Sequence, residues 1–293
     1  MKAAAFSYAR ATSIADALQL LARHGDDAKV LSGGQSLMPA LNLRLAKPAI
    51  LVDIGRLSEL RGITVASDKV TIGALTRHVD LLGSREIAEE LPLLREATAH
   101  VAHPAIRNRG TIGGNLAHAD PASELPACML ALDATLVIRG ADRERRVAAH
   151  DFFLGIYATA LAADELLTRI EIPLPAPGIR YFFHEYARRS GDYALVGLAA
   201  MARTDNGRLS DLRLGYFAVG DRPQLVRAAA RLVGVDVTPD LVAAAKAELM
   251  IELDPASDQQ ATAAMRRHLA GLLLARCVAT VLDRPELAPE QAS

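Results

Sequence analysis

The strongest signal in this sequence comes from two short loops, Ser32-Gly33-Gly34-Gln35-Ser36 and Thr111-Ile112-Gly113-Gly114-Asn115. Each joins an apolar, strand-like run to a segment rich in small and polar residues. Adjacent glycines let the backbone adopt positive φ and approach a ligand with no Cβ in the way, so successive N–H groups can converge on an anion. One glycine pair alone is weak evidence, because most such pairs are only turns. Two such loops together predict a diphosphate site. We expect Gly34 and Gly114 to be glycine because the diphosphate lies against their backbones, and not because a turn requires glycine there.

The glycine spacing does not fit a Rossmann dinucleotide site. That motif needs G-x-G-x-x-G at the start of one long helix. Here Gly33-Gly34 is followed by Gln35, Ser36 and Leu37, with no third glycine. Asp53 stands about twenty residues further on, where a Rossmann fold has its ribose-binding acid. We interpret Asp53 instead as a strand-end residue that turns the chain at Ile54-Gly55.

Length, charge and cysteine content restrict the class of protein. The chain has 293 residues, 51% of them hydrophobic, which is enough for two or three domains with cores of their own. Its net charge of −1 gives no long-range attraction for nucleic acid or an anionic membrane. Cys128 and Cys277 are the only cysteines and form no CxxC motif. We therefore expect no iron–sulfur cluster, zinc site or disulfide framework in this chain.

Targeting signals are not evident. The N-terminal apolar stretch is too short for a signal peptide, and no run approaches the roughly eighteen apolar residues of a membrane span. We expect a cytoplasmic protein with no integral membrane segment.

Hydrophobic periodicity predicts a first α/β unit over residues 1–55. Ser13 is a typical helix N-cap, apolar residues follow at i, i+3, i+4 and i+7, and Gly25 ends the helix. The remaining elements predicted in this unit are a strand at 29–31, a helix at 37–43 and a strand at 50–52.

A second, strand-rich unit is predicted over residues 56–176. Residues 103–119 form a long irregular stretch that holds the second glycine loop, and irregular stretches of this length are usually functional. Asp120 is predicted to cap the next helix, with Pro121 at its first position. The regular elements predicted here are a helix at 91–102 and strands at 69–73, 134–139, 145–148 and 165–172.

A proline cluster, Pro173-Leu174-Pro175-Ala176-Pro177, predicts a linker, because prolines neither continue a helix nor donate within a sheet. A third unit over residues 177–293 follows. Asp205-Asn206-Gly207 predicts a hairpin turn between two of its strands. Its predicted elements are strands at 181–186, 194–202 and 209–219 and helices at 223–233, 239–249 and 258–282.

The chain offers no group of its own for covalent or acid–base catalysis, so we assign no catalytic residue. His100 and His103 stand three apart, but no third ligand has a recognisable spacing, and we expect no metal site. His118 follows the second glycine loop and either contacts a phosphate or ribose or is an exposed loop histidine. Arg145 and Arg146 indicate a solvated hairpin or a basic docking patch. Phosphate-type loops without catalytic groups favour a cofactor that carries its own chemistry.

Five segments in the same order carry a resemblance to a known family. They are Lys29 to Leu37, Thr111 to Asn115, Asp120-Pro121-Ala122-Ser123-Glu124-Leu125-Pro126, Glu165 to Pro173, and Arg188-Arg189-Ser190-Gly191-Asp192-Tyr193. Over about residues 1–285 the sequence resembles the FAD-binding medium subunit of molybdenum hydroxylases, the xanthine dehydrogenase and carbon monoxide dehydrogenase family. The resemblance implies an α+β, PCMH-type FAD-binding fold: two α/β subdomains, and a C-terminal subdomain of a three-stranded antiparallel sheet with a helix bundle that covers the flavin.

The resemblance also implies which residues bind FAD. Tyr193 would lie over the isoalloxazine, Leu167 would pack near the flavin, and Ser123 and Glu124 would reach the ribose and adenine end. Val101, Ala102 and Ile106 would line the cofactor. The residues implied around the diphosphate are Lys29, Val30, Leu31, Ser32, Gly33, Gly34, Gln35, Ser36, Leu37, Gly110, Thr111, Ile112, Gly113, Gly114 and Asn115, with His118 beside them.

Three of these residues depart from the family pattern. Members similar to the carbon monoxide enzyme usually carry His at the position of Gln35 and often Asp at that of Asn115. Glu124 stands where Asp is usual, which keeps the charge and lengthens the reach. These departures change the polar surroundings implied for the diphosphate.

The implied function is electron transfer. A large partner subunit would carry the molybdenum cofactor, a small one would carry two [2Fe–2S] clusters, and FAD in this chain would pass electrons to an external acceptor, in a dimer of heterotrimers. Two alternatives stay open: a free-standing flavin oxidase of the same broad fold, and a flavin-free scaffold subunit.

Overall fold

The N-terminal part of the chain is a small parallel sheet covered by a helix. The computed structural model describes residues 2–289. Its first sheet has the strand order β1-β3-β2, and both pairings are parallel. As predicted, Ser13 accepts a hydrogen bond from the Asp16 amide at the start of α1, and Gly25 follows its end with φ +52°. The elements are β1 (Ser7–Arg10), α1 (Ile14–His24), β2 (Ala28–Leu31), α2 (Leu37–Asn42) and β3 (Ile50–Asp53).

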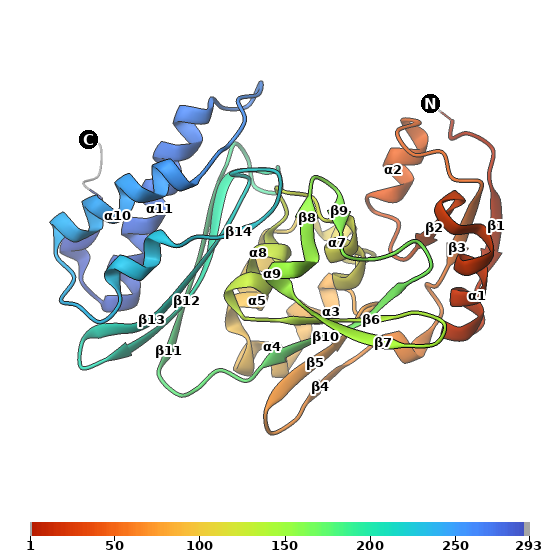
Figure 1. The fold of residues 1–293 in the computed structure, drawn as a ribbon, viewed down its shortest axis with the longest axis horizontal. Coiled ribbons are helices and arrows are strands. Elements are labelled where there is room, and N and C mark those ends of the chain that lie inside the picture. The colour runs from red at the N-terminus through yellow and green to blue at the C-terminus, as the bar shows by residue number, and fades with distance from the viewer. Residues whose placement is uncertain (1, 290–293) are drawn as a thin grey trace.

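The central part is an antiparallel sheet in the order β4-β5-β10-β6-β7, with helices gathered on one side of it (Figure 1). Sheet and helices share one hydrophobic core, in which Ile72, Ile138 and Ile170 from the strands meet Leu94 and Met129 from the helices. The strands are β4 (Ile63–Val65), β5 (Lys69–Gly73), β6 (Thr135–Arg139), β7 (Glu144–Ala148), β10 (Leu166–Pro173) and the small hairpin β8 (Phe153–Gly155) and β9 (Ala158–Thr159). The helices are α3 (His78–Gly83), α4 (Arg85–Glu90), α5 (Pro92–His100), α6 (Pro104–Arg107), α7 (Ile112–His118), α8 (Glu124–Ala131) and α9 (Ala149–Phe152).

The C-terminal part is an antiparallel sheet between two layers of helix (Figure 1). Helices α10 and α11 form the outer layer, while α5 and α8 of the central part contact the other face. Gly215 allows the closest approach, because an added Cβ there would lie 2.5 Å from the Ala127 carbonyl oxygen of α8. The elements are β11 (Ile179–Ala187), β12 (Ala194–Asp205), β13 (Arg208–Phe217), β14 (Gln224–Leu225), α10 (Pro239–Glu252) and α11 (Ala263–Leu282).

The predicted fold class is confirmed, although three local expectations are wrong. The third sheet has a fourth strand, β14, which pairs with Gly215 and Tyr216 where a helix at 223–233 was expected; only Ala228–Leu232 of that segment is helical, as a 3-10 turn. Part of the irregular stretch 103–119 is helix, as α6 and α7. Helix α8 begins at Glu124, because the Asp120 side chain accepts from the Ala122 amide and forms a turn before the helix.

The predicted boundaries, 1–55, 56–176 and 177–293, fall between the three sheets and stay a prediction of separate folding units. Residues 1 and 290–293 of those ranges lie outside the described part of the chain. Among residues 2–289, no helix combines the length and apolarity needed to cross a bilayer.

The arginines expected in a solvated hairpin belong to an ion-pair network on the central sheet. Arg145 pairs with Glu165 at 2.6 Å, and Arg146 reaches Glu171 at 3.3 Å. Lys69, at 2.9 Å, and Arg169, at 3.1 Å, also contact the Glu171 carboxylate, which is 11% exposed. Burial alone would raise the pKa of Glu171, but the hydrogen bonds from Lys69, Arg146 and Arg169 lower it to about 2. The hairpin is therefore fixed to its neighbouring strand by charge.

This network predicts acid sensitivity. Because the pKa of Glu171 is lower in the folded state than in the unfolded chain, its stabilisation is full above the unfolded value and is lost as pH falls from about 4.5 toward 2. Glu171→Gln should lower the free energy of unfolding at pH 7 by roughly 2–3 kcal/mol and flatten the acid limb of the stability curve. Urea denaturation between pH 7 and pH 3 measures this. Glu89→Gln, at an exposed helix pair, is the control, and equal pH profiles for both variants would contradict the prediction.

Candidate cofactor-binding site

The candidate site begins at the carboxyl edge of the first sheet. In open α/β sheets ligands bind outside the carboxyl ends of parallel strands, and β2 ends at Leu31, directly before the first glycine loop. Asp53, at the end of β3, accepts a hydrogen bond from the Gly55 amide at 2.8 Å. This confirms that Asp53 turns the chain.

The structure brings the two glycine loops together, although 79 residues separate them. The Ser32 and Thr111 hydroxyl oxygens lie 2.7 Å apart. Gly33 lies close to Arg109, which is two residues before the second loop; an added Cβ on Gly33 would overlap the Arg109 carbonyl oxygen. On the other side, a Cβ on Gly113 would lie 2.7 Å from the Ala74 carbonyl oxygen. The two loops therefore form a single site on the seam between the first and central parts.

The first loop presents free backbone donors. Within residues 2–289, no acceptor pairs with the amide N–H groups of residues 33–36. The Gln35 side chain donates to the Gly33 carbonyl at 3.0 Å, so it is turned onto its own loop. Consecutive unpaired N–H groups at a turn are the anion-binding arrangement that the glycines predict.

The second loop differs from the first in how its backbone amides are used. Thr111 is the N-cap of α7, and its hydroxyl accepts from the Gly114 amide at 3.1 Å. The Ile112 and Gly113 amides donate to the Thr76 and Ala74 carbonyls. Because these donors are used within the protein, the second loop forms a wall of the site and the first supplies the donors.

The glycine doublets also have reasons internal to the protein. Gly34 has φ +73°, in the left-handed region that favours glycine. A Cβ on Gly114 would lie 2.8 Å from the capping Thr111 hydroxyl. Space for a ligand is therefore not the sole reason for glycine at either position.

Further predicted residues lie beside the second loop. The Asn115 side chain on α7 donates to the Ser123 hydroxyl at 2.8 Å, which joins two residues that the sequence assigned to one site. Leu167 is buried in the central core at 4% exposure. The binding roles of all these residues stay predictions.

Aromatic rings line the rim beyond α7. The His118 ring packs on Tyr157 with centroids 4.8 Å apart. Burial lowers the pKa of His118 and so favours its neutral ring, although the Asp120 carboxylate opposes the shift. Tyr193 is 71% exposed, yet the partial desolvation of its hydroxyl and the nearby Asp120 carboxylate raise its pKa to about 12. Sequence reasoning missed Tyr157, whose hairpin tip carries no motif.

Glu124 lies at the junction of α5, α8 and β11. Burial and the Glu185 carboxylate raise its pKa to about 7, and the backbone and His100 oppose the shift. His100 Nδ1 is 3.3 Å from Glu185 Oε1. His103 instead contacts Gly191. The described part of the chain has no group of three or more His, Cys, Asp or Glu placed to hold a metal.

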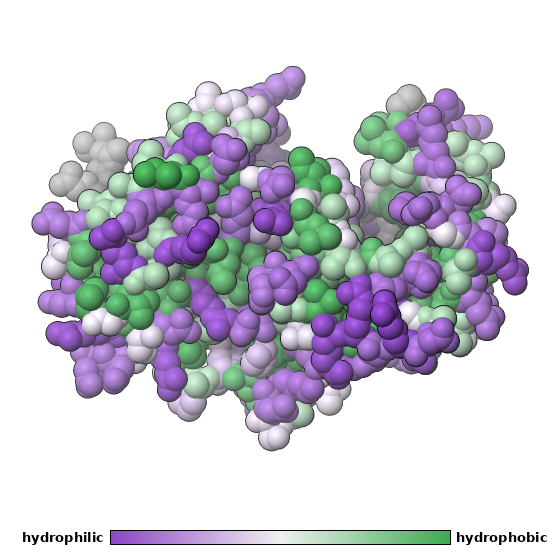
Figure 2. Space-filling model, viewed as in Figure 1, coloured by the Kyte–Doolittle hydropathy of each residue, from purple (hydrophilic) through white to green (hydrophobic). Residues whose placement is uncertain are grey.

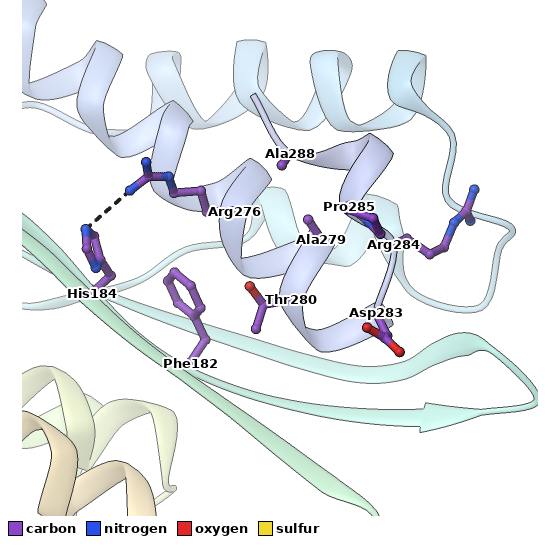
Figure 3. Close-up of a pocket in the computed structure, with 9 residues that line it drawn as sticks. All are labelled: Phe182, His184, Arg276, Ala279, Thr280, Asp283, Arg284, Pro285 and Ala288. Atoms are coloured by element: carbon purple, nitrogen blue, oxygen red, sulfur yellow. Dashed lines mark hydrogen bonds between the residues drawn. The ribbon is translucent and has the colours of Figure 1, made fainter. Parts of the chain in front are cut away.

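The surface is hollowed between the N-terminal lobe and the centre of the molecule (Figure 2). Exposed apolar residues occur just after α2 and on the β8–β9 hairpin. Leu43 and Leu45 follow the end of α2, and Leu154 and Ile156 belong to the β8–β9 hairpin; all four are exposed. A separate open cavity of about 440 Å³ lies between β11 and α11 and includes Phe182, His184 and Arg276 (Figure 3). The predicted cofactor residues do not line that cavity.

Comparison with known proteins identifies the class. Residues 4–175 match the family model described as the FAD binding domain in molybdopterin dehydrogenase, and residues 181–281 match the CO dehydrogenase flavoprotein C-terminal domain. The chain therefore carries an FAD-binding domain and is an oxidoreductase component.

Individual relatives are similar to this chain over nearly its whole length. It is 39% identical to the caffeine dehydrogenase subunit beta of Pseudomonas sp. (strain CBB1), covering 97% of both chains. Its fold matches carbon monoxide dehydrogenase from Hydrogenophaga pseudoflava with a TM-score of 0.94, 37% identity and coverage of 97% of this chain and 99% of the other. Quinoline 2-oxidoreductase from Pseudomonas putida 86 matches with a TM-score of 0.90, 40% identity and coverage of 97% and 99%. The chain belongs to the family of FAD-binding medium subunits of molybdenum hydroxylases.

The residues present fit FAD. The unpaired amides of residues 33–36 suit its diphosphate, and the overlap that a Cβ on Gly33 would make with Arg109 shows how closely the two walls meet.

Alanine substitutions at Gly33 and Gly34 in the first loop should have different effects on stability and on FAD binding. Gly34→Ala should lower the free energy of unfolding by about 1–2 kcal/mol with or without FAD, because alanine is strained at positive φ. Gly33→Ala should instead separate the loops and weaken FAD binding by at least about tenfold. Thermal melting of the FAD-free chain and FAD titration distinguish them. Tight FAD binding by Gly33→Ala would show that the two loops do not form one site.

Proposed function

We propose that this chain binds one FAD non-covalently between residues 32–36 and 111–115 and transfers electrons from the iron–sulfur clusters of a partner subunit to an external acceptor. The observation that carries the proposal is the row of unpaired amides at the carboxyl edge of the first sheet, closed by the capped start of α7. This arrangement binds an anion through dipoles that are already in place.

The chain's own residues would bind and orient the cofactor. The first loop would hold the diphosphate, and the linked Asn115 and Ser123 side chains would border it. Tyr193 presents an exposed ring, and aromatic faces stack on planar ring systems. When bound, FAD would supply the redox chemistry, accepting electrons and passing them to the acceptor.

The organic substrate would react on a partner subunit. Both cysteines of this chain are buried, and burial raises their thiol pKa values, so neither is placed to ligate a cluster. We propose a large partner with the molybdenum cofactor and a small partner with two [2Fe–2S] clusters, assembled as a dimer of heterotrimers. Support comes from relatives that are themselves subunits, such as the carbon monoxide dehydrogenase medium chain of Afipia carboxidovorans.

Flavin content tests the proposal directly. The full chain, purified with any accompanying subunits, should contain one FAD per copy of this chain, and acid or heat should release it intact. Visible absorption and chromatography of the released flavin measure both. Flavin that stays on the polypeptide after denaturation would indicate a covalent flavin oxidase, and a chain that binds no FAD would indicate a scaffold.

Tyr193→Ala tests the aromatic contact. Because Tyr193 is exposed, the variant should keep the melting temperature of the FAD-free protein. An aromatic pair contributes about 0.5–1.5 kcal/mol beyond area burial, so FAD binding should weaken by roughly threefold to tenfold. Titration monitored by flavin fluorescence measures this. Unchanged affinity and fluorescence would remove Tyr193 from the site.

A further inference from the structure

The loop that carries Tyr193 packs on the central part of the molecule at Gly191. It connects β11 to β12 and contains Gly191, whose φ is +85°. An added Cβ on Gly191 would lie 2.5 Å from His103 Nδ1 and 3.0 Å from the Ala102 carbonyl oxygen. The Gly191 backbone therefore packs directly on the His103 ring, two residues before Tyr193.

The surface that receives Gly191 is itself held in an unusual conformation. Ala102 has φ +44°, in the left-handed region that non-glycine residues rarely adopt. Arg107 Nη1 donates to both the Val101 and the Ala102 carbonyl oxygens at 2.8 Å. One guanidinium thus closes the turn between α5 and α6, and this turn presents His103 as the N-cap of α6.

We propose that Arg107, His103 and Gly191 form a latch that sets the position of Tyr193, with Arg107 as a positioning residue. The latch joins the C-terminal sheet to the same 101–106 segment that we expect to line the cofactor. Tyr193 is 71% exposed. Its loop is held on one side by Ala194, which begins β12 and pairs with Ala187, and on the other by Gly191, which packs on the latch. This inference rests on the proposed FAD function only for its effect on the flavin.

A matched pair of glycines tests the latch. Gly178 has φ +84°, almost the same as Gly191, but a Cβ there would meet nothing within 4 Å. Gly178→Ala and Gly191→Ala therefore introduce the same backbone strain, and only Gly191→Ala collides with His103. Hydrogen exchange of the FAD-free full chain should be faster in residues 188–195 for Gly191→Ala, by about tenfold on the scale of lost local protection. It should be unchanged in that segment for Gly178→Ala.

Two further variants identify the members of the latch. His103→Ala should raise exchange in residues 188–195, because the Gly191 backbone loses the ring on which it packs. Arg107→Met should raise exchange in both 101–107 and 188–195, while Arg107→Lys should recover part of the protection. Arg85→Met, at an exposed ion pair on α4, is the control. Equal exchange for Gly191→Ala and Gly178→Ala, or no change for Arg107→Met, would overturn the proposal.

The flavin provides the second readout. With FAD bound, Arg107→Met and Gly191→Ala should each alter flavin fluorescence in the direction of Tyr193→Ala, and adding either to Tyr193→Ala should give little further change. Additive effects would overturn the link to Tyr193. If the wild-type chain binds no FAD, the proposed function fails, whereas the exchange experiment still decides whether the latch exists.

Discussion

The close approach of two backbones determines the rest of this structure. Gly33 lies against the Arg109 carbonyl, and the Ser32 and Thr111 hydroxyls meet at 2.7 Å. This contact fixes the edge of a parallel sheet against a helix N-terminus from another part of the chain. The loop with the free amides therefore lies at the seam between these two parts. A side chain at position 33 would not fit, so the site depends on the absence of one Cβ.

Close packing at a glycine also joins the C-terminal part to the central part. Helix α8 packs on α5 and α7 of the central part and on the third sheet, where Gly215 admits the Ala127 carbonyl. The chain that leaves β11 then reaches back to His103 through Gly191. Three glycine contacts, far apart in sequence, thus position the parts that surround the proposed cofactor.

The sequence predicted those features that short-range interactions determine. The cap at Ser13, the turn at Asp53 and the strands β5, β6, β7, β10, β11, β12 and β13 follow from periodicity and short-range hydrogen bonds. Helix α7 was missed because its first turn contains a glycine doublet, and its stability comes from the Thr111 cap and packing on Ala74. Strand β14 was missed because its partner is β13, which lies earlier in the chain. Tyr157 joins the rim only through the folded hairpin, which no spacing reveals.

The proposed diphosphate site offers dipoles rather than formal charge. Burial lowers the pKa of His118 and so favours its neutral ring, and Gln35 is turned onto its own loop. In the second loop, the Ile112 and Gly113 amides donate to carbonyl groups of the protein itself. The donors that remain are backbone groups in a loop whose geometry is set by Gly33 and Gly34. Fixed dipoles need no reorganisation when a ligand arrives, and they act at short range. A chain with net charge −1 can therefore bind a diphosphate without a basic patch, and its selectivity for the cofactor has to come from the shape of the seam and from the rings beyond it.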